Sequence, residues 1–153
     1  MSVAFRRDGD EEHREPKFEV PIPAGPNLVT ARGLTLIGDR IAELECELAA
    51  ATEEPVRASL LRDLRYWKAR QVTAAVAPKA AADRVEFGTR VTIAMNGTRR
   101  TLAIVGDDEA DPPGGLISFN AALSRAMLGA EVGDVVAFSR AGDAIEILDI
   151  AAA

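Results

Sequence analysis

The stretch that decides the fold of the first half of the chain is residues 34–48, LTLIGDRIAELECEL. Its large apolar residues recur at spacings of three, four, three and four: Leu34, Ile37, Ile41, Leu44 and Leu48. This repeat places them on one stripe of an α-helix and is typical of a coiled-coil seam. Thr30 is a suitable N-cap, because its hydroxyl can accept a hydrogen bond from a free backbone N–H. We therefore predict a helix that begins after Thr30 and ends near Ala51.

A second helix is predicted after a short turn. Residues 52–55, TEEP, carry a proline, which a first helical turn tolerates, and two carboxylates, which a helix N-terminus favours. The following segment has Leu60, Leu64 and Trp67 on one face and ends before Pro78. The first arm is mostly acidic and the second mostly basic, which favours their pairing. We predict an antiparallel hairpin over residues 30–77, with arms about 30 Å long at 1.5 Å per residue.

The C-terminal half has the pattern of a small antiparallel sheet. Residues 90–95 alternate between polar and apolar, Asn96-Gly97 is a hairpin-turn dipeptide, and residues 98–105 return as the partner strand. Asn120 is the predicted N-cap of a short helix that ends at Gly129. Further strands are predicted at residues 116–119, 135–138 and 144–150, the last two joined by a turn at residues 140–143. The fold class is therefore α+β, with a helical hairpin ahead of an antiparallel β domain.

Two segments flank these elements. Residues 1–29 are polar, charged and rich in proline, so we predict a flexible arm, in which residues 17–20 could form a short edge strand. Residues 78–83 are rich in alanine and are predicted to link the hairpin to the β domain, residues 84–153.

The composition narrows the classes of function. A net charge of −6 argues against a protein that holds nucleic acid by neutralising its phosphates. No apolar run approaches the roughly 20 residues that span a membrane, and the N-terminus lacks a signal-peptide core. We therefore expect a cytoplasmic protein with no membrane partner. Cys46 is the only cysteine, which excludes an internal disulfide and fits a reducing compartment.

The most acidic segment is VGDDEADPPGG, residues 105–115, with four acids within five positions. A calcium-binding EF-hand loop requires glycine at position 6 and glutamate at position 12. Counted from Asp107, these positions hold Pro112 and Ser118, so the motif fails. A looser Mg²⁺ site and a solvated acidic loop are the alternatives, and we expect no intrinsic metal site.

An ordered series of motifs explains the acidic segment differently. IVGDDEAD at 104–111, ISFN at 117–120, LSRAMLG at 123–129 and VGDVV at 132–136 resemble the C-terminal domain of the bacterial Gre transcript-cleavage factors. NLVTARG at 27–33 resembles the opening of the family's N-terminal coiled coil. The resemblance implies an FK506-binding-protein-like domain behind a coiled coil, with the acidic segment as a loop between strands.

The resemblance also implies a function in transcription elongation. Gre factors bind RNA polymerase at its secondary channel, dock by the C-terminal domain and bring an acidic hairpin tip to the active site. There the tip helps to hold a Mg²⁺ ion that supports cleavage of backtracked RNA. We expect an accessory factor that is not an enzyme by itself, has no cofactor of its own, and shares Mg²⁺ with the polymerase. RNA and DNA would be contacted only through the elongation complex, and we expect a monomer.

The hairpin tip departs from the family pattern. It lacks the family's GDLSENAEY stretch, and the hairpin is shorter, as in the Rnk-type relatives that bind polymerase without stimulating cleavage. Glu53 and Glu54 are the only carboxylates at the tip. Three roles are open for them: catalytic acids that approach Mg²⁺, stabilising charges at a helix N-terminus, or channel contacts without chemistry.

The docking segment departs as well, because the family's Asn-Ser-Pro is Asn-Ala-Ala here. The candidate partner-binding residues are Ser118, Asn120, Ala121, Ala122 and Arg125. Helix capping is a second role for Asn120, compatible with docking. The basic residues of the second helix are expected to form a solvated or salt-bridged face, and contact with RNA or acidic polymerase surfaces is the alternative.

Two further hypotheses belong to other classes of function. A prolyl isomerase could share the implied fold, but fold does not carry function, and 5% aromatic residues leave little for an aromatic-lined proline pocket. A coiled-coil module unrelated to transcription, such as a dimeriser, is the other hypothesis, and a monomeric mass in solution would count against it.

Overall fold

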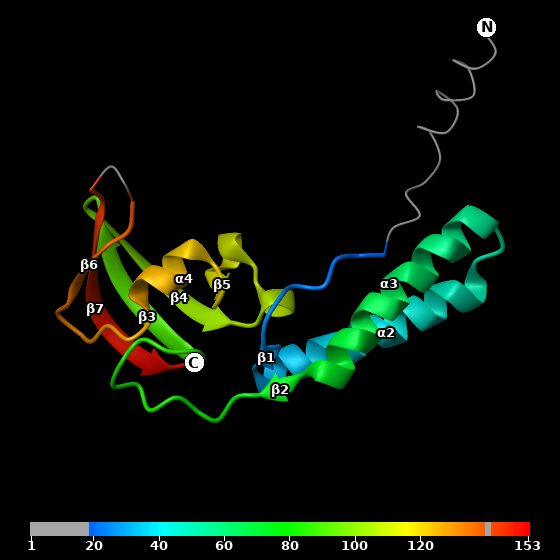
Figure 1. The fold of residues 1–153 in the computed structure, drawn as a ribbon, viewed down its shortest axis with the longest axis horizontal. Coiled ribbons are helices and arrows are strands. Elements are labelled where there is room, and N and C mark those ends of the chain that lie inside the picture. The colour runs from blue at the N-terminus through cyan, green and yellow to red at the C-terminus, as the bar shows by residue number, and fades with distance from the viewer. Residues whose placement is uncertain (1–18, 140–141) are drawn as a thin grey trace, which may run out of the picture.

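The computed structural model describes residues 19–139 and 142–153. Figure 1 shows an elongated helical hairpin beside a β domain, joined by an extended segment, residues 77–88. Residues 1–18, most of the predicted arm, and residues 140–141 of the predicted last turn lie outside the described residues. In the part of the chain that is described, neither long helix is apolar enough to cross a membrane.

The hairpin consists of α2 (Ala31–Ala50) and α3 (Glu54–Thr73). The predicted N-cap is confirmed, because the Thr30 hydroxyl accepts a hydrogen bond from the Gly33 N–H at 2.9 Å. Pro55 lies in the first turn of α3, also as predicted. Arg57 donates to the carbonyl oxygens of Leu48 and Ala51, both at 3.0 Å. These bonds satisfy acceptors that the end of a helix leaves free, and so they stabilise the turn.

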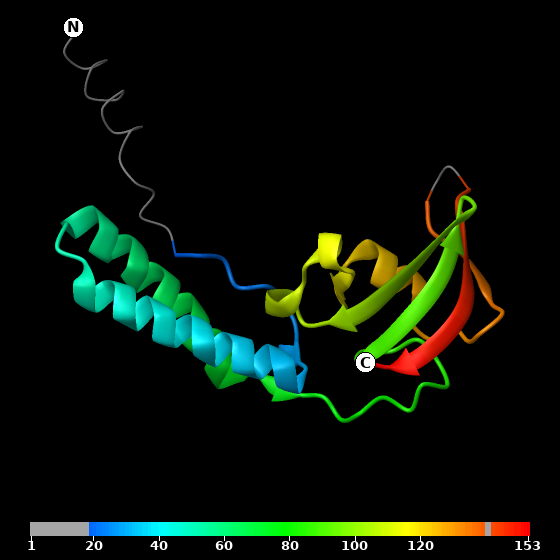
Figure 2. The ribbon, with the colours of Figure 1, turned by 180° about the vertical axis from the view of Figure 1, so that it is seen from behind.

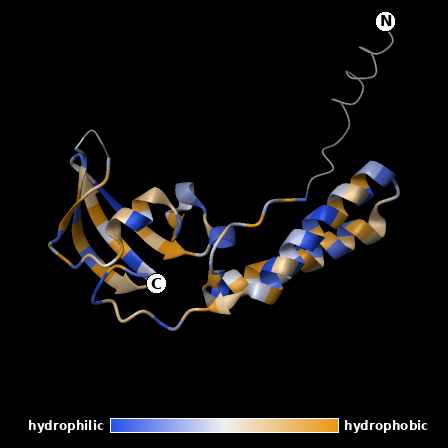
Figure 3. Cartoon of the chain, viewed as in Figure 1, coloured by the Kyte–Doolittle hydropathy of each residue, from blue (hydrophilic) through white to orange (hydrophobic). Residues whose placement is uncertain are grey.

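The hairpin core is the predicted seam. It comprises the buried residues Val29, Ile37, Ile41, Leu44, Leu60 and Leu64. Trp67 is partly buried against this cluster, which confirms its predicted packing role. Polar and apolar residues alternate around both helices in Figure 3, as expected for helices that bury one stripe. Across the exposed side of the hairpin, Lys68 Nζ lies 3.5 Å from a carboxylate oxygen of Glu45.

A short parallel strand pair at the base of the hairpin was not predicted. β1 (Leu28–Val29) pairs with β2 (Ala75–Val76), directly after α3. The buried Asn27 side chain donates to the carbonyl of Arg70 at 2.8 Å and to the hydroxyl of Thr73 at 3.1 Å. Residues 27–29, which the composition places in the arm, are therefore tied to the base of the hairpin.

The β domain is a five-stranded sheet in the order β5-β4-β3-β7-β6. Its strands are β3 (Thr89–Met95), β4 (Thr98–Val105), β5 (Leu116–Ser118), β6 (Val135–Ala137) and β7 (Ala144–Ala152). Asn96 and Gly97 both have positive φ, 51° and 76°, as a two-residue hairpin turn requires. β5 runs parallel to β4, so the prediction of a wholly antiparallel sheet is wrong at this edge. The reason is that residues 106–115 form a crossover connection in place of a tight turn.

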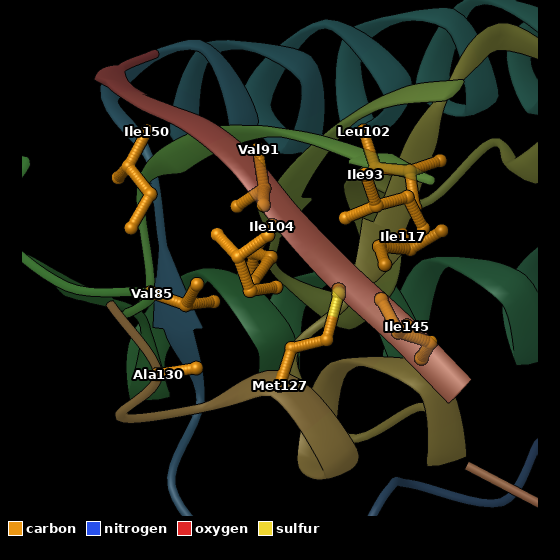
Figure 4. Close-up of a cluster of buried hydrophobic side chains, with 11 residues drawn as sticks. Val85, Val91, Ile93, Leu102, Ile104, Ile117, Met127, Ala130, Ile145 and Ile150 are labelled. Atoms are coloured by element: carbon orange, nitrogen blue, oxygen red, sulfur yellow. The ribbon is translucent and has the colours of Figure 1, made fainter. Parts of the chain in front are cut away.

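The core of the β domain lies between the sheet and α4 (Ala122–Met127), as Figure 4 shows. Met127 from the helix meets the inward-facing side chains of the strands, among them Val91, Ile93, Leu102, Ile104, Ile117, Ile145 and Ile147. The alternation predicted for residues 90–95 is thereby confirmed in β3, whereas the last four residues of β4 are all buried. Gly129, at φ +87°, follows the helix end as predicted.

The prediction that Asn120 caps α4 is wrong. The N-cap position is occupied by Ala121, which has no side chain able to accept a capping bond. The Asn120 amide instead donates to the carboxylate of Asp107, at 3.1 and 3.2 Å. The helix therefore begins one residue later than predicted, and the Asn120 side chain is oriented by the charged carboxylate of Asp107, a stronger acceptor than a neutral group.

Candidate functional site

The predicted tip residues Glu53 and Glu54 lie at the end of the hairpin remote from the β domain (Figure 1). Both are exposed. Glu53 is the N-cap of α3 and makes no side-chain capping bond, whereas Glu54 lies in the first turn. Negative charge is favoured at this end of a helix, so a stabilising role follows from position alone. Their predicted role as catalytic acids stays a prediction.

The predicted docking residues come together at the start of α4, and Asp107 organises them. The Ser118 hydroxyl donates to Asp107 Oδ1 at 2.5 Å, beside the two bonds from Asn120. The Asn120 N–H in turn donates to the Ser118 hydroxyl at 3.0 Å, and the buried Ser124 hydroxyl donates to the Ser118 carbonyl at 2.6 Å. Ala121 and the exposed residues Ala122 and Arg125 follow directly.

The acidic segment contains two short 3₁₀ turns, η1 (Asp107–Glu109) and η2 (Pro112–Gly114). Its interpretation as a solvated loop is wrong for Asp108 and Glu109, whose side chains are only 7% and 4% exposed. Views from opposite sides place η1 between the base of the hairpin and the β domain (Figures 1 and 2). The acids are buried because the hairpin covers them.

Glu109 binds the start of α2. It accepts a hydrogen bond from the Thr30 hydroxyl and another from Arg32 Nη1 at 2.8 Å. Thr30 thus serves both as the N-cap of α2 and as a donor to the other domain. The approach is close, because a Cβ added at Gly33 would lie 2.9 Å from Glu109 Oε1.

Asp108 binds the last turns of α3. It accepts hydrogen bonds from the Tyr66 hydroxyl and from Arg70 Nε, the latter at 2.6 Å. Arg70 is only 2% exposed, and its Nη2 atom lies 3.7 Å from Asp107 Oδ2 without a hydrogen-bond partner. Arg70 is therefore a buried cation between two consecutive carboxylates. We refer to η1 with its hairpin partners Thr30, Arg32, Tyr66 and Arg70 as the interdomain contact.

These pairings show what the charged segments contact within the chain. The acids of η1 turn toward different partners, and the described residues contain no group of three or more metal-ligating side chains. On α3, Arg65 binds Glu19 at 2.7–3.0 Å and Lys68 binds Glu45. Together with Arg57 and Arg70, these contacts confirm a salt-bridged and hydrogen-bonded role for much of the basic run.

Burial, reinforced by the bond to Asp108, raises the pKa of Tyr66 well above its ordinary value of 10. A phenolate at this position would face the carboxylates of Asp108 and Asp107 in a poorly solvated environment. The folded protein therefore retains the phenol proton at pH values where an unfolded chain releases it.

We expect the stability that Tyr66 contributes to be complete below pH 10 and to be lost as the pH rises above it. In that range the unfolded state gives up a proton that the folded state keeps, so the free energy of unfolding falls. Tyr66 is the only tyrosine, so the absorbance of tyrosinate reports on it alone. Native protein should ionise at higher pH than protein in denaturant, and coincident titrations would contradict this. Asp108→Asn should bring the native titration closer to pH 10.

Tyr66 and Arg70 were not singled out by sequence reasoning. They are four residues apart and so share a face of α3, beside the seam of Leu60 and Leu64. A tyrosine and an arginine on one face of α3 are a weak signal that this face, next to the hairpin seam, is also covered by another part of the protein. The covering loop could not be named, because it lies 38 residues beyond Arg70 in the chain.

Comparison with known proteins identifies the β domain. Residues 79–152 match the family described as transcription elongation factor GreA/GreB, C-terminal. Transcription elongation factor GreA of Mesorhizobium japonicum is 40% identical over 68 residues, 43% of each chain. The same factor from Caulobacter vibrioides is 42% identical over 76 residues, 47% of this chain and 48% of the relative. The match thus spans less than half the length of these relatives.

Two solved structures are also similar in outline. GreA factor homolog 1 (Gfh1) of Thermus thermophilus is 14% identical, with a TM-score of 0.40 over 83% of this chain and 99% of that one. The GreA/GreB factor of Nitrosomonas europaea is 18% identical, with a TM-score of 0.40 over 83% and 98%.

The chain thus carries a helical hairpin ahead of a GreA/GreB-type C-terminal domain. Residues 79–152 therefore form a GreA/GreB-type C-terminal domain, which the chain shares with the Gre factors.

Proposed function

We propose that the protein is a transcription elongation regulator that binds bacterial RNA polymerase at its secondary channel. The C-terminal domain docks through the segment around Asn120, and the hairpin extends toward the pore. The observation that carries the proposal is the C-terminal domain itself, which matches the Gre family over residues 79–152. Its docking segment is held in one conformation by the bonds of Ser118 and Asn120 to Asp107.

Two modes of action are compatible with this proposal. In the first, Glu53 and Glu54 help the polymerase to hold Mg²⁺ and so stimulate cleavage of backtracked RNA. Their exposure at the remote end of the hairpin supports this mode. In the second, the protein occupies the channel and excludes other factors without chemistry. The length of the arms supports this mode, since 20 residues span only about 30 Å.

Cleavage of RNA in a purified, backtracked elongation complex tests the proposal and separates the two modes. In the first mode the protein shortens the transcript, and Glu53→Ala/Glu54→Ala lowers the cleavage rate about 100-fold, because the carboxylates that hold the metal are gone. In the second mode neither protein cleaves, and both suppress cleavage by a standard Gre factor.

The matched control is Glu43→Ala/Glu45→Ala. It removes two exposed carboxylates from α2 below the tip and should behave as wild type in either mode. Folded protein that neither binds core polymerase nor alters cleavage would overturn the proposal. An equal loss in the control and the tip variant would show that overall charge matters and the tip does not.

A further inference from the structure

We propose that Arg70 is a positioning residue that, paired with Asp108, fixes the direction of the hairpin relative to the docking segment. The geometric part of this inference stands on the interdomain contact alone. Its consequence for transcription rests on the proposed function.

Polar side-chain contacts, together with the close backbone approach of Gly106 to β1, set the relative placement of the two domains. The hairpin and the β domain each have a hydrophobic cluster, and the two clusters share no residue. The connecting residues 77–88 form neither helix nor strand. Neither a common apolar core nor a regular connecting element therefore sets the angle between the domains.

The interdomain contact holds the hairpin at two points. Glu109 binds Thr30 and Arg32 at the start of α2, while Asp108 binds Tyr66 and Arg70 near the end of α3. One point would allow the hairpin to pivot, whereas two points on different helices oppose rotation. Arg70 is the more constrained cation, because it is 2% exposed and Arg32 is 65% exposed.

The same turn also holds the docking segment. Asp107 accepts bonds from Ser118 and Asn120, and the next residue, Asp108, accepts the bond from Arg70. The carboxylate that holds the docking segment (Asp107) and the carboxylate that holds the hairpin (Asp108) therefore belong to adjacent residues. Arg70 Nη2, 3.7 Å from Asp107 Oδ2, contributes further attraction between them.

Loss of Arg70 should separate the domains without unfolding either one. Asp108 would be left as a buried carboxylate without its cation, which is strongly unfavourable. Because the clusters are separate, opening the contact to water relieves this cost and leaves both cores intact. The expected result is a folded protein whose hairpin samples many directions.

Distances between paired spin labels test the geometric part. One label is placed on Cys46, the only cysteine, which is exposed on α2. The other is placed on Glu146→Cys, exposed on β7. We expect a single narrow distance distribution for the parent protein and a broad or shifted one for Arg70→Gln. The matched control is Arg65→Gln, which removes an exposed pair on the same helix and should leave the distribution unchanged.

Polymerase assays test the consequence. Arg70→Gln should bind core polymerase with wild-type affinity, because the docking segment is intact. It should lose about tenfold or more of the cleavage activity, because the hairpin no longer points in one direction from the docked domain. Equal loss of affinity and activity would overturn the positioning role.

An unchanged distance distribution in folded Arg70→Gln would overturn the proposal. Circular dichroism establishes whether this variant folds, and, if it does not, Asp108→Asn decides, because it keeps the shape of the side chain but removes its charge. A broadened distribution in Asp108→Asn supports the proposal, and an unchanged one refutes it. If the parent protein does not bind polymerase, the proposed function fails, while the distances in the free protein still decide the geometry.

Discussion

Replacing Leu44 by alanine is expected to lower the free energy of unfolding by about 2–5 kcal/mol. Leu44 is completely buried at the centre of the hairpin seam, among only five other buried apolar residues. The substitution removes apolar contacts and leaves a cavity that two rigid helices cannot readily close. Chemical denaturation measures the change in the free energy of unfolding. The fluorescence of Trp67 reports on the hairpin, because Trp67 packs against this cluster.

The matched control is Leu61→Ala. Leu61 lies on α3 but is 40% exposed, so its truncation removes less buried surface and leaves no enclosed cavity. It should cost well under half as much as Leu44→Ala. Equal losses would mean that the seam is not the core of the hairpin.

The second large effect is expected at Gly106, the residue just before η1. A Cβ added there would lie 2.4 Å from the carbonyl oxygen of Leu28 in β1, which is backbone and cannot rotate away. Gly106→Ala must therefore displace either β1 or η1, and it should cost about 1–3 kcal/mol. The same displacement should weaken the interdomain contact. Denaturation and the Cys46–Glu146→Cys spin-label distance both report on it.

Gly38→Ala is the matched control and should have the opposite sign. Gly38 lies inside α2, and an added Cβ would find its nearest neighbour, an atom of Gln71, at 4.0 Å. Alanine is the better helix former, so stability should rise by about 0.5–1 kcal/mol. If Gly106→Ala is as stable as wild type and the spin-label distances are unchanged, the prediction is wrong. The structure would then accommodate a side chain between η1 and Leu28 without displacing either.

Much of the local structure could be predicted from residue patterns. The seam of α2, the cap at Thr30, Pro55 at the start of α3 and the Asn96-Gly97 turn depend on neighbours within a few residues. The motifs in residues 104–136 indicate a Gre-type C-terminal domain, and the family match over residues 79–152 confirms it. The tip and docking residues, by contrast, stay predictions until the polymerase experiments are done.

The errors have a common origin in long-range contacts. The parallel pairing of β5 with β4 cannot be predicted locally, because a strand pattern does not specify the direction of its partner. The neighbours of Asn120 in sequence predict a capping role, because its charged partner, Asp107, lies 13 residues earlier. The acids of η1 were considered solvated because nothing in their own segment shows that a helix covers them.

The sequence by itself determined the two long helices, the main strands of the β domain and their order, since helical and strand periodicities and turn dipeptides act locally. Only the tertiary structure decided which residues the acidic segment contacts. Its partners lie far away in the chain: Arg70 is 38 residues from Asp108, and Arg32 is 77 residues from Glu109. A carboxylate binds whichever cation the fold brings within about 3 Å, so its role is fixed by packing and not by its neighbours in sequence.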